Sequence, residues 1–248
     1  SLLINMDVNM KKIITICLCL AFVAVLVYVC QSRNSSATTS NNEPMIFSFA
    51  EACDKHNCYD RVILASGQVL GNSFDSFTKF LEENKTLNNS KSNITVCFDS
   101  NGGDNKAGFD IGEEISKRGY NTCMAERYIT AENEEVNGTK CNSICPFILL
   151  AGESRIKYGS DFKLGFHASS DYLKLCGFEI YREERSNDPN YIDSFNKQIK
   201  SYSTHNPQYK PMRNQQEFVQ KVFRINGNSE QYMHIDDMNT YNIFTSSK

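Results

Sequence analysis

The sequence predicts an α/β domain that extends from residue 45 to residue 248. Segments with strand-like and helix-like apolar spacing alternate between residues 61 and 167, which is typical of parallel strands joined by right-handed crossovers. A pair of glycines joins a buried strand to a helix within this stretch. The chain has 248 residues, 40% of them hydrophobic, and this is sufficient for one sizeable core.

The N-terminal segment predicts export or membrane attachment. Lys11 and Lys12 precede an almost unbroken apolar run over residues 13–30, and about 18 apolar residues are just long enough to span the hydrocarbon core of a bilayer. Residues 31–44 are rich in Ser, Asn and Thr. We therefore expect residues 1–30 to be a signal or single membrane anchor, residues 31–44 to be a disordered tether, and the domain to lie outside the cytoplasm.

The composition narrows the classes of partner and cofactor. Lys and Arg total 26 against 29 for Asp and Glu, the net charge is −3, and no Lys/Arg-rich run is present, so we expect no nucleic-acid partner. Cys53 and Cys58 flank His56, but no second pair of ligands with zinc spacing follows. We therefore expect a local disulfide here, and neither a metal nor a cofactor.

The individual elements follow from apolar spacing and from start and stop residues. Strands are predicted at 45–50, 61–69, 94–98, 122–128, 155–158 and 164–167. Helices are predicted at 72–84, 106–118, 191–202 and 215–223. Two polar segments, 130–140 and 171–193, are expected to be insertions, the first of them solvated.

Ser143 stands at the head of a short apolar run that ends at Gly152, so we expect it at the start of a helix. Backbone N–H groups are unpaired at such a position and can stabilise a developing negative charge. Pro146 fits a first helical turn, where the N–H that proline lacks is not needed. An ordinary N-cap serine would give the same pattern, so the case for a nucleophile depends on the neighbouring motifs.

Two such motifs are present. The predicted strand 94–98 leads into Asp-Ser-Asn-Gly-Gly, and the glycines at 102 and 103 allow the backbone to approach a ligand closely and to present an N–H. The strand 164–167 ends at His167, which can act as a general base.

These motifs resemble the Clp protease proteolytic subunit and its relatives in the crotonase-like superfamily. The resemblance rests on Ser-Asn-Gly-Gly at 100–103, Ser-Ile-Cys-Pro-Phe-Ile-Leu-Leu-Ala-Gly at 143–152 and Gly-Phe-His at 165–167. A still closer resemblance is to uncharacterised periplasmic Clp-like proteins of bacteria, which carry a Cys-x-Ser-x-Cys segment behind a membrane anchor. The resemblance covers residues 60 to 170 well, and it implies a crotonase-like, Clp-like ββα superhelix.

The resemblance also implies roles for particular residues. Ser143 would attack a carbonyl, and His167 would take the proton of the serine and return it to the leaving group. The loop of Gly102 and Gly103, together with Ile144, would form the oxyanion hole.

The third catalytic residue is less well determined. Glu230 falls nearest to the position of the family's acid, while Asp193, Asp236 and Asp237 remain open, as does a Ser-His dyad. The chain also has Asn101 where the family has Pro. Of these departures, the undetermined catalytic acid is the weakest part of the resemblance.

The resemblance implies a serine peptidase that acts on a peptide or protein substrate. It would lie at the periplasmic face of the bacterial inner membrane, held there by the N-terminal segment, or be secreted to the periplasm, and it could form a homo-oligomer. Two alternatives stay open. One is a non-catalytic Clp-like protein that binds peptide or assembles a complex, and the other is a crotonase-like acyl-group enzyme.

The cysteines of the domain suggest an oxidising compartment. There are seven: Cys53, Cys58, Cys97, Cys123, Cys141, Cys145 and Cys176. We expect a Cys53–Cys58 disulfide, and because the number is odd we expect one free thiol, namely Cys97 on a buried strand. Cys141 and Cys145 flank Ser143, and either a disulfide between them or one to Cys123 would hold the nucleophile segment.

Overall fold

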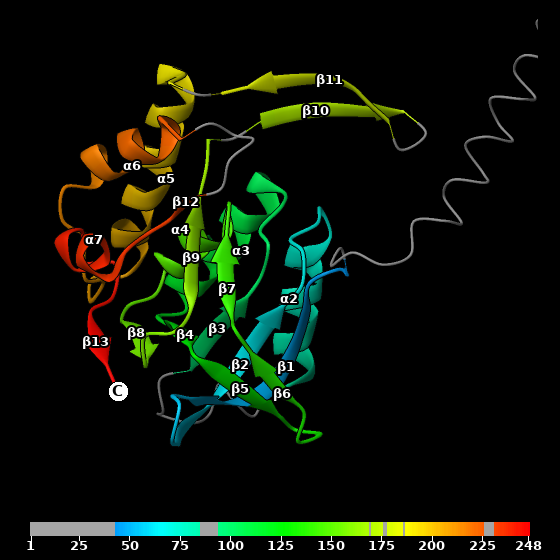
Figure 1. Cartoon of the computed structure of the whole chain (residues 1–248), viewed down its shortest axis with the longest axis vertical. Helices are drawn as coiled ribbons and strands as arrows, with labels where there is room; N and C mark the ends of the chain where they lie inside the picture. The colour runs from blue at the N-terminus through cyan, green and yellow to red at the C-terminus, as the bar shows by residue number, and fades with distance from the viewer. Residues whose placement is uncertain (1–42, 85–93, 169, 176–177, 186, 226–230) are drawn as a thin grey trace, which may run out of the picture. The chain divides into compact units, whose positions relative to one another are not determined.

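The computed structural model describes residues 43–84, 94–168, 170–175, 178–185, 187–225 and 231–248. The main unit is a mixed α/β structure built on one eight-stranded sheet (Figure 1), so the predicted α/β class is confirmed. Residues 171–183 belong to a separate small unit, in which β10 (Ser170–Leu175) and β11 (Phe178–Glu184) form a two-stranded sheet of their own.

The large sheet has the strand order β13-β8-β4-β3-β2-β1-β5-β6. Its strands are β1 (Ile46–Cys53), β2 (Cys58–Ser66), β3 (Thr95–Asp99), β4 (Asn121–Ala125), β5 (Arg127–Thr130), β6 (Glu135–Asn137), β8 (Arg155–Tyr158) and β13 (Ser246–Ser247). Strands β2, β3, β4 and β8 are mutually parallel, as expected of strands joined by helical crossovers. The N-terminal edge, formed by β1, β5 and β6, is antiparallel.

Six helices of the described chain pack in the main unit: α2 (Ser73–Glu83), α3 (Asn105–Lys117), α4 (Cys145–Leu149), α5 (Pro189–His205), α6 (Gln215–Phe223) and α7 (Ile235–Thr240). Alternate residues of β3 point to opposite faces of the sheet. Val96 and Phe98 join the large core cluster formed with the helices, whereas Cys97 joins a smaller cluster with Tyr128 and Tyr158. The helices therefore cover the face to which Val96 and Phe98 point.

A second, three-stranded sheet positions the candidate site. Its order is β12 (Gln231–Tyr232), β9 (Lys163–Phe166) and β7 (Lys140–Asn142). Strands β7 and β9 are parallel and lie side by side, with Cys141 opposite Leu164 and Asn142 opposite Gly165 (Figure 1). Helix α4 follows β7 after a two-residue turn.

Some predicted boundaries were wrong. The strand expected at 122–128 is divided into β4 and β5 at Glu126, whose carboxylate turns away to accept hydrogen bonds from the N–H groups of Ser160 and Asp161. The segment expected to be a solvated insertion at 130–140 contains β6 and the start of β7. The other expected insertion contains most of β10, all of β11 and the start of α5. Its aromatic and aliphatic residues favour the two strands.

The membrane segment stays a prediction. The apolar run at 13–30 and the tether at 31–42 lie outside the described residues. Among the residues that the structure does describe, no helix has both the length and the apolar character needed to cross a membrane.

The structure contains three disulfides within its described residues. The predicted Cys53–Cys58 disulfide is confirmed. The expectation that Cys97 is a free thiol was wrong, because Cys97 and Cys123 lie directly opposite each other on the parallel strands β3 and β4, with 4.4 Å between their Cα atoms, and they form a disulfide. The third disulfide joins Cys141 to Cys145; Cys176 lies outside the described residues.

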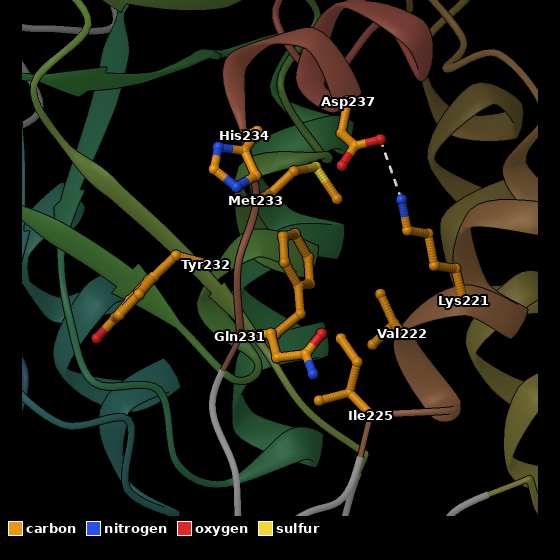
Figure 2. Close-up of a pocket in the computed structure, with 9 residues that line it drawn as sticks. Lys221, Val222, Ile225, Gln231, Tyr232, Met233, His234 and Asp237 are labelled. Carbon is orange, nitrogen blue, oxygen red and sulfur yellow. Dashed lines mark hydrogen bonds and ion pairs between the residues drawn. The ribbon is translucent and has the colours of Figure 1, made fainter.

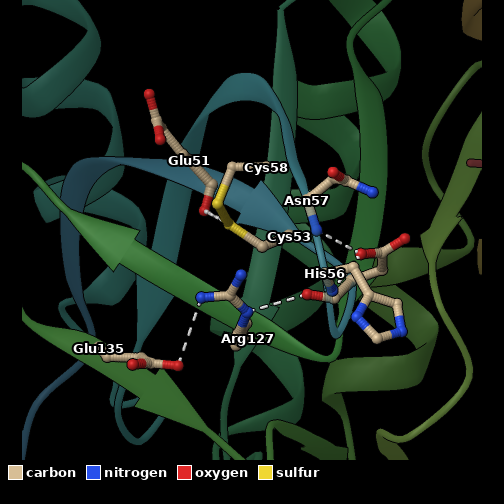
Figure 3. A network of polar contacts seen from close by, with 8 residues as sticks. Glu51, Cys53, His56, Asn57, Cys58, Arg127 and Glu135 are labelled. Carbon is tan, nitrogen blue, oxygen red and sulfur yellow. Dashed lines mark hydrogen bonds and ion pairs between the residues drawn. A yellow bond between two sulfur atoms is a disulfide. The ribbon is translucent and has the colours of Figure 1, made fainter.

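The Cys53–Cys58 disulfide closes the β1–β2 hairpin at the surface (Figure 3). Inside the loop, the side-chain carboxylate of Asp54 accepts hydrogen bonds of 2.7 Å from the backbone N–H groups of His56 and Asn57. The backbone carbonyl of Asp54 accepts a hydrogen bond of 2.9 Å from the guanidinium of Arg127. Arg127 also lies 3.4 Å from Glu135. Hydrogen bonds from Tyr59 and from the loop backbone lower the pKa of Asp54 to about 2. The loop is thus a braced turn whose two cysteines are bonded to each other.

Candidate active site

Ser143 occupies a strained turn between a strand and a helix. It lies between the end of β7 and Ile144, the N-cap of α4, and its φ angle is 60°, in the left-handed region. A residue with a side chain costs about 1–2 kcal/mol in that conformation. Strained strand-to-helix turns of this kind expose the nucleophilic serine in α/β-hydrolases. The alternative that Ser143 is an ordinary N-cap was wrong, because α4 has no side-chain cap hydrogen bond.

Two restraints hold the turn in this conformation. The Cys141–Cys145 disulfide joins the residues on either side of it, with 5.2 Å between their Cα atoms. The N–H of Ser143 donates a hydrogen bond of 3.0 Å to the carbonyl of Gly165 on β9. The serine is therefore tied both to its own helix and to the neighbouring strand.

The glycine loop after β3 lies directly against this turn. Gly102 has a φ angle of 79°, and a Cβ placed on it would lie 2.5 Å from the Cβ of Ser143 and 3.0 Å from the nitrogen of Ile144. Its N–H donates a hydrogen bond of 3.0 Å to the hydroxyl of Ser100. Gly102 thus allows the close approach of the two segments, while its own N–H is already used.

The other two candidates for the oxyanion hole, Gly103 and Ile144, have backbone N–H groups that are not used within the described structure. Within the described residues, neither the N–H of Gly103 nor that of Ile144 donates a hydrogen bond. Gly103 is exposed, whereas Ile144 is buried. An unpaired backbone N–H is a ready donor for an anion, and two of them beside a serine can stabilise an oxyanion.

His167 lies at the same end of the neighbouring strand as Ser143. Because Asn142 pairs with Gly165, Ser143 lies level with Phe166, and His167 is one residue further along. No hydrogen bond joins these two described side chains in the structure, so their direct contact stays a prediction.

The imidazole of His167 is oriented by a backbone carbonyl. Its Nδ1 lies 2.8 Å from the carbonyl oxygen of Ala168. A proton on Nδ1 satisfies that carbonyl and leaves Nε2 with a free lone pair, which is the tautomer that a general base requires. A backbone carbonyl at this distance can hold an imidazole in one orientation, as a carboxylate does in a triad.

The position of a third catalytic acid stays open. Glu230 lies outside the described residues. Two of the alternatives are engaged elsewhere, since Asp193 forms an ion pair of 2.7 Å with Lys197 and Asp237 one of 3.0 Å with Lys221.

Sequence reasoning missed one acidic residue near the site. Asp99 ends β3 and precedes the glycine loop, and burial raises the pKa of its carboxyl group. The carboxylate accepts a hydrogen bond of 3.1 Å from the N–H of Lys140, at the start of β7. Asp99 thus helps to join the glycine loop to the nucleophile strand. Its place at the end of a buried parallel strand was the available signal.

A cavity of about 340 Å³ opens beside β9 and β12 (Figure 2). It is lined by Phe166, Lys221, Val222, Ile225, Gln231, Tyr232, Met233, His234 and Asp237. The Lys221–Asp237 ion pair lies on one side, and the aliphatic side chains of Val222 and Ile225 form another (Figure 2). Because Phe166 lines the cavity and is followed by His167, one strand connects the cavity with the candidate base.

The comparisons with known proteins gave a distant structural likeness. No protein-family model and no curated protein sequence matches the chain. Among solved structures, it is similar to a serine-to-alanine mutant of the 1510-N membrane-bound stomatin-specific protease, with 14% identity over 75% of this chain and 77% of that chain and a TM-score of 0.49. A lysine-to-alanine mutant of the same protease in complex with a substrate peptide gives 14% identity, 75% and 73% coverage and a TM-score of 0.48. A likeness at this level assigns neither family nor activity.

Proposed function

We propose that the chain is a Clp-like serine peptidase that hydrolyses peptide bonds at Ser143. The observation that carries the proposal is the strained strand-to-helix turn, with φ of 60° at Ser143, the unpaired N–H of Ile144 next to it, and the unpaired N–H of Gly103 one residue after Gly102, which packs against the turn. Strain of this kind persists only where the surrounding structure enforces it, and it is concentrated at functional sites.

The reaction follows from the positions of these groups. The hydroxyl oxygen of Ser143 attacks the peptide carbonyl while Nε2 of His167 accepts its proton. The negative charge that develops on the carbonyl oxygen is stabilised by the N–H groups of Gly103 and Ile144. His167 then gives the proton to the departing amine, an acyl-enzyme remains, and water releases it by the same steps.

The proposal includes a Clp-like, crotonase-like arrangement of the domain outside the cytoplasm. Three disulfides among the described residues support an oxidising compartment, because such bonds persist in exported proteins and are rare in the cytosol. The lysine pair and apolar run at the N-terminus support attachment to the periplasmic face of a bacterial inner membrane.

A non-catalytic, peptide-binding relative is the second candidate. The observation in its favour is that the described side chains of Ser143 and His167 form no hydrogen bond. A catalytic pair without substrate can also be separated, because such contacts tighten when substrate binds.

Labelling with a fluorophosphonate probe tests the proposal. The native protein should be labelled at Ser143, and the label should be lost in Ser143→Ala and His167→Ala. His205→Ala is a matched control, because His205 lies at the end of α5 beside Glu113 and should keep the label. An unlabelled native protein would favour the non-catalytic candidate, and a label that survives His167→Ala would mean that another group activates the serine.

A further inference from the structure

Asn142 is a buried polar residue whose side chain lacks a hydrogen bond. It is the last residue of β7, directly before Ser143, and it is 3% exposed. Its Oδ1 atom has no hydrogen-bond partner. Among the described residues, one other buried side-chain oxygen or nitrogen is unpaired, namely the hydroxyl oxygen of Tyr209. Buried polar atoms are nearly always paired, so an unpaired one requires an explanation.

A structural asparagine in the same fold behaves differently. Asn121, at the start of β4, is 7% exposed, and its Oδ1 accepts a hydrogen bond of 3.1 Å from the N–H of Ser154. The backbone N–H of Asn142 is used, because it donates to the carbonyl of Ser100 at 3.0 Å. The unpaired Oδ1 is therefore the feature that separates Asn142 from Asn121.

The strand register places this side chain on the face of the small sheet that points away from the large core. Cys141 points into the core, where it joins the disulfide with Cys145, so Asn142 points to the opposite face. Its partner across β9 is Gly165, which has no side chain to cover it. If the alternation of β9, which ends at Phe166, continues for one residue, His167 lies on the same face as Asn142.

We propose that Asn142 is a specificity-determining residue whose Oδ1 accepts a hydrogen bond from a substrate N–H that flanks the carbonyl attacked by Ser143. The inference rests on the proposed hydrolase function and specifies its substrate class. A peptide carries an N–H on the carbon beside the attacked carbonyl, whereas a simple acyl ester or thioester has none there. An acceptor that stays unpaired in the free protein and is paired by substrate favours peptides over such acyl esters.

The experiment uses a pair of peptidyl diphenyl phosphonates. One has an N–H on the carbon that bears phosphorus, and the other is N-methylated at that nitrogen. In both, the Ser143 oxygen bonds to phosphorus, one phenoxide leaves, and His167 accepts the serine proton. The native protein should be labelled about tenfold faster by the N–H probe, the effect of one hydrogen bond to a buried acceptor. In Asn142→Leu the two rates should become equal.

Thermal unfolding supplies a second, independent readout. Asn142→Leu removes an unpaired acceptor and keeps a similar volume, so its unfolding midpoint should be equal to or above that of the native protein. Asn121→Leu, the matched control, should unfold at a lower temperature because it loses a formed hydrogen bond, and it should keep the tenfold probe preference.

The remaining outcomes each decide against the inference. A preference that persists in Asn142→Leu would mean that another group binds the N–H. A fall of both labelling rates by the same factor would mean that Asn142 only supports the Ser143 turn. A native protein that neither phosphonate nor fluorophosphonate labels would overturn the hydrolase proposal itself, and this inference with it.

Discussion

Replacement of Gly102 by alanine tests whether the glycine loop really lies against the nucleophile. The new Cβ would lie 2.5 Å from the Cβ of Ser143, 3.0 Å from the nitrogen of Ile144 and closer still to the carbonyl oxygen of Asn142. Two of these three atoms are backbone atoms, so the clash can be relieved only by moving the strained turn away from the loop.

The cost has two parts that a control variant separates. The φ angle of 79° at Gly102 costs an alanine about 1–2 kcal/mol, and overpacking of a tight contact costs about 1–3 kcal/mol more. Gly138 has a similar φ of 61°, but a Cβ there would have no atom within 4 Å. We therefore expect Gly138→Ala to lose about 1–2 kcal/mol and Gly102→Ala about 2–5 kcal/mol of the free energy of unfolding.

Urea unfolding at equilibrium would measure both variants, and fluorophosphonate labelling would report on the site. Gly102→Ala should be labelled at least about tenfold more slowly than the native protein, since a displacement of about 1 Å at a reacting group costs that much or more. Gly138→Ala should be labelled at the native rate. Equal destabilisation of the two variants, with equal labelling, would refute the contact between the glycine loop and Ser143.

Three further predictions concern the surroundings of the site. Burial raises the pKa of Asp99 above its ordinary 3.8, so ionisation of this carboxyl group destabilises the folded state. Asp99→Asn should therefore raise the unfolding midpoint at about pH 7, and this gain should vanish at about pH 3. A variant whose stability depends on pH as the native protein's does would contradict the burial of the carboxylate. Replacing Cys141 and Cys145 with serine removes their disulfide, and this should lower the free energy of unfolding in urea by about 2 kcal/mol and slow the labelling of Ser143. Labelling at the native rate would show that the turn does not need the disulfide. Phe147→Ala should cost about 3–5 kcal/mol in the same assay, because its buried ring contacts those of Phe166 and Phe195, and a loss under about 1 kcal/mol would contradict this packing.

Elements with a strong local signal could be predicted from the sequence. Helix α6 was predicted at 215–223 and strand β8 at 155–158, and both bounds agree with the structure. Their apolar spacing and flanking residues are sufficient to define them. The division of the strand at Glu126 was not predictable, because the carboxylate is drawn away by N–H groups that lie 34 and 35 residues later in the chain.

The same distinction applies to the candidate site. The order of glycine loop, serine and histidine is visible in the sequence, and the parallel strands β7 and β9 bring Ser143 and His167 to one end of the small sheet. The burial of Asn142 and the pairing of Cys97 with Cys123 depend on which strands are neighbours and in which register. Register is a property of the assembled sheet, so neither feature has a local signature.

The conformation of Ser143 shows why such a site requires the whole fold. A serine has no intrinsic preference for a φ of 60°, so the turn would relax if nothing opposed it. Relaxation is opposed from three separate segments: the disulfide through α4, the hydrogen bond to Gly165 of β9, and the packing of Gly102 after β3. Each restraint alone is comparable in free energy with the strain of about 1–2 kcal/mol. Together they exceed it, and Ser143 keeps its left-handed conformation directly before α4.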